Sequence, residues 1–308
     1  MSEKQPLKCG LSLRSPRPEP ASPLSQALLA KAKERLRAGD LVVAKTLFEK
    51  LCQDDPQNAR AHYYLALTLQ ALGEHPRGPE AEYEAAVTLD RTLTKASVAL
   101  AKLLFAAGDS QATLRVTDGG LKTAPKEPEL LYYRARSLDW LGRIPEALAA
   151  YAFADNAGDS GPKLHAAYGA LLSEAGKGPQ ALAELKAALT TSEPALLASV
   201  AESFAKEGAF DECIQAMDRA LAKENSVTWL VQRAVCRDGN KDGESEKDYQ
   251  DALAHYPKLP ILNFYYGLHL VAKDKQKALH YLDSAATIAG ERGVGPKARR
   301  RAAELRQP

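Results

Sequence analysis

The residues of this sequence best suited to chemistry are its histidines and cysteines, and none of them falls into a short catalytic or ligand motif. They are His62, His75, His165, His255, His269, His280, Cys9, Cys52, Cys213 and Cys236. No HxxxH, CxxC or mixed Cys/His spacing occurs, so no metal site is predicted. We expect His62 and His165 to face the core of the fold.

Other catalytic signatures are also missing from the sequence. Gly293-Val294-Gly295 lacks the rest of a dinucleotide-binding fingerprint, and neither a phosphate loop nor a GxSxG nucleophile context occurs. Abundant Asp and Glu residues are accounted for by helix surfaces. The sequence therefore predicts a protein that is not an enzyme and that binds no cofactor.

Composition indicates a folded, intracellular chain. Hydrophobic residues make up 45% of the 308 residues and charged residues 26%. The four cysteines are far apart, which predicts reduced thiols in a reducing compartment and hence a cytoplasmic protein. No apolar run approaches the roughly 20 residues of a membrane span, and the first 20 residues lack the apolar region of a signal peptide.

The formal charge of +2 is unevenly placed along the chain. Residues 1–24 carry +2 and residues 290–308 carry +4, which leaves −4 for residues 25–289. A mildly acidic body with basic ends does not fit a nucleic-acid-binding protein.

A glycine-centred turn recurs along the chain at a nearly constant interval. The turns are Gly39-Asp40, Gly73-Glu74, Gly108-Asp109, Gly142-Arg143, Gly176-Lys177 and Gly208-Ala209, and Asn240-Lys241 and Asp274-Lys275 continue them. The six glycines are 34, 35, 34, 34 and 32 residues apart. We expect a left-handed residue at each turn, because glycine and asparagine adopt that conformation at the end of a helix.

The segment between 128 and 161 shows what lies on either side of such a turn. Leu131, Ala135 and Leu138 precede the turn at helical spacing, and Ala147 and Tyr151 follow it. Alternating bulky and small residues over about 34 positions resemble a tetratricopeptide repeat. One repeat cannot bury its own apolar face, so the resemblance implies an all-α, right-handed superhelical solenoid of about eight helix-turn-helix units.

The predicted organisation has three parts. Residues 1–24, with five prolines, form a disordered leader, and residues 290–308 form a basic capping helix or tail. The predicted units are 25–58, 59–93, 94–127, 128–161, 162–193, 194–225, 226–259 and 260–289. Their eighth residue is small in every unit except the seventh, where Arg233 occupies it.

In this family the first helix of each unit lines the inner wall of the superhelix, where partners usually bind. The resemblance then implies a binding groove that contains Lys33, Arg37, Arg60, Tyr63, Tyr64, Lys95, Lys102, Phe105, Tyr132, Tyr133, Arg136, Trp140, Phe264 and Tyr265. The first three units contribute five positive charges and no negative one. Tyrosine and tryptophan offer large contact area at low entropic cost. Alternatively, the tyrosine pairs pack between neighbouring helices and the charges are simply solvated.

We therefore expect a non-enzymatic adaptor that binds a peptide or helix of another protein, acidic and with apolar anchors. One alternative is an accessory or assembly subunit of an enzyme or secretion complex that uses its convex face or basic ends. Two others are nucleic-acid binding through Arg299–Arg301 and self-association through a terminal unit.

Overall fold

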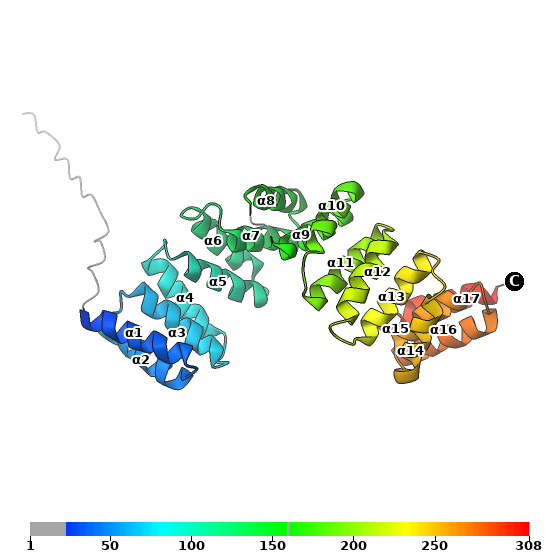
Figure 1. Cartoon of the computed structure of the whole chain (residues 1–308), viewed down its shortest axis with the longest axis horizontal. Helices are drawn as coiled ribbons and strands as arrows, with labels where there is room; N and C mark the ends of the chain where they lie inside the picture. Colours follow the sequence, from blue (N-terminus) through cyan, green and yellow to red (C-terminus); the bar gives the residue numbers. More distant parts are fainter. Residues whose placement is uncertain (1–22, 159–160, 308) are drawn as a thin grey trace, which may run out of the picture. The chain divides into compact units, whose positions relative to one another are not determined.

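The computed structural model describes residues 23–158 and 161–307, and within these ranges the chain is all α-helix with no strand (Figure 1). The chain divides into two compact units, Met1–Arg134 and Ala135–Pro308, with the boundary inside helix α7. The predicted all-α repeat solenoid is confirmed. The division into eight repeat units stays a prediction.

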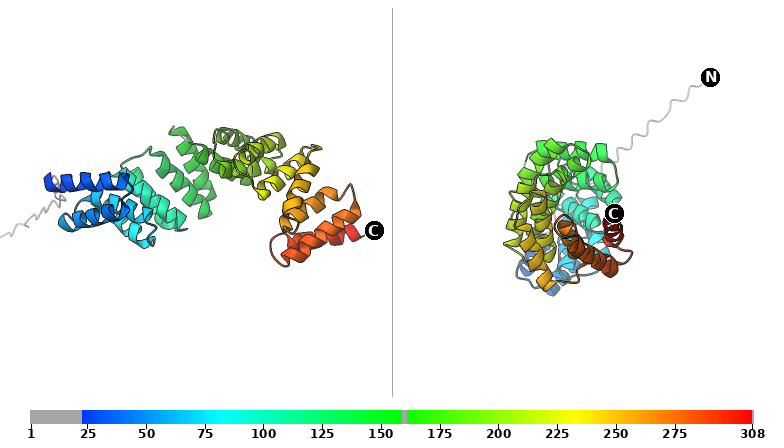
Figure 2. Two further views of the ribbon diagram at one scale, coloured as in Figure 1. Left: turned by 60° about the horizontal axis from the view of Figure 1, so that its bottom comes forward. Right: turned by 90° about the vertical axis from the view of Figure 1, so that its right-hand side faces the viewer.

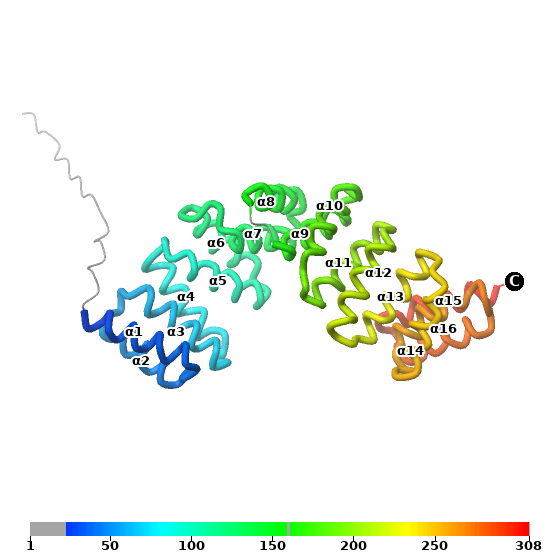
Figure 3. The backbone as a smooth tube through the Cα atoms, viewed as in Figure 1, coloured from blue at the N-terminus to red at the C-terminus, as the bar shows by residue number. Residues whose placement is uncertain are grey.

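The helices of the first unit are short and similar in length. They are α1 (Pro23–Arg37), α2 (Leu41–Asp54), α3 (Ala59–Ala71), α4 (Arg77–Leu89), α5 (Thr94–Ala106), α6 (Ser110–Leu121) and the beginning of α7 (Pro128–Trp140). Helices α1 and α2, α3 and α4, and α5 and α6 pack as hairpins, which the backbone tube shows as a chain that runs back and forth (Figure 3).

The second unit continues the same pattern. After the end of α7 it contains α8 (Ile144–Asn156), α9 (Pro162–Glu174), α10 (Gly178–Ala188), α11 (Pro194–Lys206), α12 (Phe210–Leu221), α13 (Val227–Gly239), α14 (Ser245–His255), α15 (Pro260–Leu270), α16 (Lys275–Ala289) and α17 (Gly295–Arg306). Each of α9, α11, α13 and α15 packs against the helix that follows it.

Local sequence explains where these helices start. Proline occupies the first turn of α9, α11 and α15, where its missing N–H costs nothing and its fixed φ suits a helix. The side chains of Asn58, Asp109 and Asp274 accept hydrogen bonds from backbone N–H groups of α3, α6 and α16.

The predicted left-handed turn is confirmed at all six glycines of the series, whose φ values lie between +69° and +82°. The two turns that lack glycine differ: the seventh has its left-handed residue one position late, and the prediction is wrong for the eighth. In the seventh, Lys241 has φ +57° and Asn240 is the αR cap of α13, because α13 extends through Gly239 and shifts the turn by one residue. In the eighth, Asp274 is extended with φ −151° and caps α16 with its side chain.

The core lies between the two helices of a hairpin and between successive hairpins. Ala32 of α1 faces Ala44 and Phe48 of α2, and all three are fully buried. Bulky Tyr83 and small Ala66 repeat this arrangement in the next hairpin. Small residues let the helices approach closely, and the large residues fill the remaining space.

The ends of the helical region differ in part from the expectation. Helix α1 begins at Pro23, so the predicted leader is wrong for residues 23 and 24, because proline at the first helical position favours a start there. Residues 1–22 lie outside the described part. The predicted C-terminal helix is confirmed as α17, which packs against α16 (Figure 2). Among the described helices, none is long and apolar enough to cross a bilayer.

The expectation of reduced thiols is wrong for two of the four cysteines. Cys213 of α12 and Cys236 of α13 form a disulfide, with their Cα atoms 6.1 Å apart. The packing of α12 against α13 brings these separated residues together in the core, where neither is exposed. Cys52 is free, and Cys9 lies outside the described residues.

A polar network around the buried side chain of His269 joins α13, α14 and α15. His269 has a carboxylate at each ring nitrogen: Asp238 Oδ1 lies 2.6 Å from Nδ1, and Glu246 Oε2 lies 2.7 Å from Nε2. The hydroxyl of Tyr266 also donates to Glu246 Oε1 at 2.6 Å. Burial by itself raises the pKa of Glu246, but the hydrogen bonds from Tyr266 and His269 outweigh burial and hold the pKa at about 2.

This network predicts a specific loss of stability in acid. Since the folded-state pKa of Glu246 is below its ordinary 4.5, its contribution is present above pH 4.5 and is lost as the pH falls from 4.5 towards 2. Urea unfolding at a series of pH values should show that Glu246→Gln loses less stability over this range than the wild type. Glu244→Gln, on an exposed neighbour, should follow the wild-type profile. Parallel profiles for the wild type and Glu246→Gln would contradict the assignment.

Candidate functional site

Most of the residues predicted to line a groove lie in the first compact unit, on the first helix of each hairpin. Lys33 and Arg37 lie on α1, and Arg60, Tyr63 and Tyr64 on α3. Lys95, Lys102 and Phe105 lie on α5, and Tyr132 and Tyr133 at the start of α7. We call these ten residues the α1–α7 surface.

The aromatic residues of α3 are held in place by the core. Tyr64 stacks on the fully buried Phe48 of α2 with ring centroids 5.7 Å apart, and Tyr63 lies edge-on to Tyr64 at 5.1 Å. Lys33 Nζ lies 4.9 Å from the centre of the Tyr64 ring, in cation–π range. Burial raises the pKa of Tyr63 above its ordinary value. Both tyrosines are half-buried, so each has a fixed orientation and an accessible part.

A second aromatic group occupies the other end of this surface. Phe105 and Tyr133 have ring centroids 5.6 Å apart, and Tyr132 lies edge-on to Tyr133 at 5.2 Å. All three side chains are half-buried. The tyrosine pairs thus pack against neighbouring helices, as the alternative expectation held, while keeping part of their surface accessible.

The five cations of the surface have no carboxylate partner in the described part of the chain. Lys33 is half-buried, and Arg37, Arg60, Lys95 and Lys102 are exposed. Other cations of the same unit are paired. For example, Lys45 Nζ lies 2.6 Å from Glu74 Oε1, and Arg134 Nε lies 2.7 Å from Asp118 Oδ1. Positive charge on the α1–α7 surface is therefore not neutralised by the described residues around it.

The four remaining predicted groove residues belong to the second unit. Trp140 of α7 is 71% exposed, and Arg136 and Tyr265 are half-buried. The prediction for Phe264 is wrong, because it is buried in a cluster with Leu282 of α16 and Ala298 of α17. Helix α17 covers Phe264, so this side chain is not accessible to a ligand.

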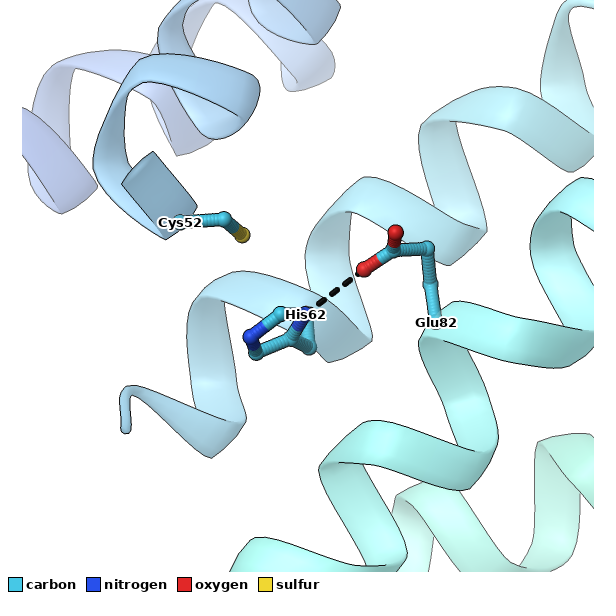
Figure 4. A group of neighbouring side chains, drawn as sticks. All are labelled: Cys52, His62 and Glu82. Carbon is cyan, nitrogen blue, oxygen red and sulfur yellow. Dashed lines mark hydrogen bonds and ion pairs between the residues drawn. The ribbon is translucent and has the colours of Figure 1, made fainter. Parts of the chain in front are cut away.

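Sequence spacing did not reveal a cluster of possible metal ligands in the first unit. Cys52 near the end of α2, His62 of α3 and Glu82 of α4 place one ligand atom each within 4.8 Å of the others (Figure 4). His62 Nδ1 lies 2.6 Å from Glu82 Oε2, and His62 Nε2 lies 3.2 Å from the carbonyl oxygen of Pro56. The neighbouring Cys52 and Glu82 side chains raise the pKa of His62 to about 10.

A related cluster occurs in the second unit. Asp155, His165 and Glu184 also bring three ligand atoms within 4.8 Å, and His165 Nδ1 lies 2.8 Å from Glu184 Oε2. In both clusters the histidine follows the first ligand by 10 residues: Cys52 and His62 in one, Asp155 and His165 in the other. Alignment of the repeat units is the sequence signal that could have revealed this correspondence. The side chains of His62 and His165 are 15% and 17% exposed and lie against carboxylates of the next helix, so they face inward but into polar surroundings.

Comparison with known proteins supports the repeat assignment. Residues 29–93 match the family model described as tetratricopeptide repeat. A comparison with curated proteins finds no relative of this sequence.

Solved structures share the fold over most of the chain. Yeast Tom70 matches 94% of this chain and 65% of its own at 16% identity with a TM-score of 0.51. A chain of the APC/C hetero-tetramer Cut9-Hcn1 matches 89% of this chain over 55% of its own length, at 15% identity and a TM-score of 0.55. PilF of Pseudomonas aeruginosa matches 77% of this chain over 94% of its own length, at 14% identity and a TM-score of 0.50. This chain thus spans less than two thirds of the first two structures, and the likeness concerns the fold alone.

Proposed function

We propose that the α1–α7 surface binds an acidic segment of another protein, because residues 29–93 match the tetratricopeptide repeat model and a solenoid of such repeats implies a scaffold for protein–protein interaction. Members of the family are generally non-catalytic. The ligand would present carboxylates to Lys33, Arg37, Arg60, Lys95 and Lys102. Apolar side chains between those carboxylates would contact the tyrosines.

The single observation that carries this proposal is that the helices which present half-buried aromatic rings also carry five cations without a carboxylate partner among the described residues, one of them, Lys33, over the Tyr64 ring. Complementary charge speeds encounter and selects against basic partners, whereas the aromatic rings supply contact area. Exposed ion pairs contribute about 0–1 kcal/mol each, so the tyrosines must supply much of the affinity. The proposed ligand therefore needs both acidic and apolar side chains.

The basic C-terminal end is a poorer candidate for binding. Arg299 pairs with Glu291, Arg300 and Arg301 pair with Glu304, and Arg306 pairs with Asp283. These internal ion pairs already occupy four of the six cations in residues 290–308. They favour the α1–α7 surface over the alternatives that depend on Arg299–Arg301.

Selection of displayed random peptides on the purified full chain tests the proposal. Enriched sequences should combine Asp or Glu with aromatic or aliphatic residues. Enrichment of basic sequences, or of sequences without charge preference, would contradict it.

Charge reversal on the surface should weaken binding of the selected acidic peptides. We expect Lys33→Glu combined with Lys102→Glu to lower affinity about 10- to 30-fold, because each reversal removes an attraction and adds a repulsion. Fluorescence anisotropy at low salt measures the change, and the difference should shrink as salt is added.

A matched control places the same charge change elsewhere in the unit. Lys50 of α2 and Lys122 at the end of α6 are exposed and lie outside the α1–α7 surface. Lys50→Glu combined with Lys122→Glu gives the same net charge and should change affinity by less than about threefold. Equal losses in the two double variants would show that net charge, not this surface, attracts the peptide.

A further inference from the structure

We propose that Cys52, His62 and Glu82 form a binding site for zinc or a similar thiolate-preferring divalent cation. The site lies within the first hairpins and is independent of the proposed peptide-binding function. Its three ligands come from three successive helices, α2, α3 and α4, so the packing of the hairpins holds them together (Figure 4).

The spacing of the ligand atoms suits a small cation. Zinc binds sulfur at about 2.3 Å and imidazole nitrogen at about 2.0–2.1 Å, which places tetrahedral ligands about 3.5 Å apart. The ligand atoms of this cluster lie within 4.8 Å of one another, and His62 Nδ1 and Glu82 Oε2 are 2.6 Å apart. Small side-chain rotations are therefore enough to place all three around one ion.

A backbone contact already orients the imidazole for this role. His62 Nε2 lies 3.2 Å from the carbonyl oxygen of Pro56, to which it can donate its proton. That hydrogen bond leaves Nδ1, the nitrogen that faces Glu82, as the metal ligand. In metal sites the second ring nitrogen commonly donates to a carbonyl or carboxylate in this way.

The donor set favours zinc over harder cations. Thiolate and imidazole are ligands of zinc, whereas magnesium and calcium select oxygen alone. On binding, bonds form from the ion to Cys52 Sγ, His62 Nδ1 and a Glu82 oxygen. The thiol proton of Cys52 and the proton held between His62 and Glu82 pass to solvent, and water takes the fourth position.

The second cluster provides an internal comparison. Asp155 replaces the cysteine, while His165 and Glu184 keep the histidine and the carboxylate. His165 Nδ1 lies 2.8 Å from Glu184 Oε2 and 3.7 Å from Asp155 Oδ1. Without a thiolate, this cluster cannot give a metal–sulfur signal, so such a signal cannot come from the second cluster.

Cobalt titration of the purified full chain, handled without oxygen or reductant so that Cys52 stays a thiol and the Cys213–Cys236 disulfide stays closed, tests the proposal. One equivalent of Co²⁺ should produce the charge-transfer absorption of a cobalt–thiolate bond, and Zn²⁺ should abolish it. Cys52→Ser should remove the absorption, and both Cys52→Ser and His62→Gln should lower zinc affinity about tenfold or more, since loss of an outer contact alone costs about 10–100-fold. Cys9→Ser and His165→Gln should keep the wild-type absorption.

A gain-of-ligand variant keeps the test decisive if the loss variants fold poorly. Asp155→Cys gives the second cluster the donor set of the first, and it should bind a second equivalent of Co²⁺ with the same absorption. Wild-type protein of normal helical content that shows no cobalt–thiolate absorption would overturn the proposal. Unchanged absorption in Cys52→Ser would overturn it as well.

Discussion

Replacing Asp248 by Ala is expected to lower the free energy of unfolding by about 3 kcal/mol, the lower end of the range for breaking a buried ion pair. The carboxylate of Asp248 is 2% exposed and accepts hydrogen bonds from Arg233 Nε at 2.9 Å and Nη2 at 2.7 Å. Arg237 Nη1 lies 2.9 Å from the same carboxylate. Removal of the Asp248 carboxylate leaves the guanidinium groups of Arg233 and Arg237, whose side chains are 19% and 16% exposed, without their shared buried counter-charge.

The expected loss is at the lower end because Asp218 Oδ1 still lies 2.6 Å from Arg233 Nη1. Asp218 is also the matched control: it is 50% exposed and faces the same guanidinium, so Asp218→Ala should cost less than about 1 kcal/mol. Urea unfolding of the full chain measures both losses of stability. Hydrogen exchange should show that the loss in Asp248→Ala is concentrated in α13 and α14. Equal losses for the two variants would contradict a special role for the buried carboxylate.

Phe48→Ala is the second large effect, with an expected loss of about 3–5 kcal/mol. The ring of Phe48 is fully buried in one cluster with Ala32 of α1 and Leu65 of the next hairpin. Its removal leaves a cavity that joins α1, α2 and α3. The same change removes the support on which Tyr64 stacks, so affinity for selected acidic peptides should fall as well.

A conservative substitution of Phe48 tests whether the loss of stability comes from the cavity or from any change at this position. In the hairpin of α9 and α10, Leu185 occupies the position that corresponds to Phe48, because it follows the small residue Gly169 by sixteen residues, as Phe48 follows Ala32. Phe48→Leu should therefore cost no more than about 1.5 kcal/mol. Thermal unfolding and peptide binding of both variants check this. If Phe48→Leu were as damaging as Phe48→Ala, the cavity would not be the cause.

The sequence by itself determined the local structure of this protein. Glycine spacing located six helix-ending turns, because a left-handed residue at such a turn is a local backbone requirement. Small and bulky residues at helical spacing identified Leu131, Ala135 and Tyr151 as residues of the apolar face, and all three are buried. These features depend only on neighbours close in the chain.

Tertiary structure decided where residues of separate helices meet. Arg233 occupies the small-residue position of its hairpin because Asp248, on the next helix, neutralises it. Phe264 is buried because α17 covers it, and Cys52, His62 and Glu82 meet because α2, α3 and α4 pack side by side. Such contacts depend on the rotation and approach of whole helices, which a one-dimensional spacing pattern does not contain.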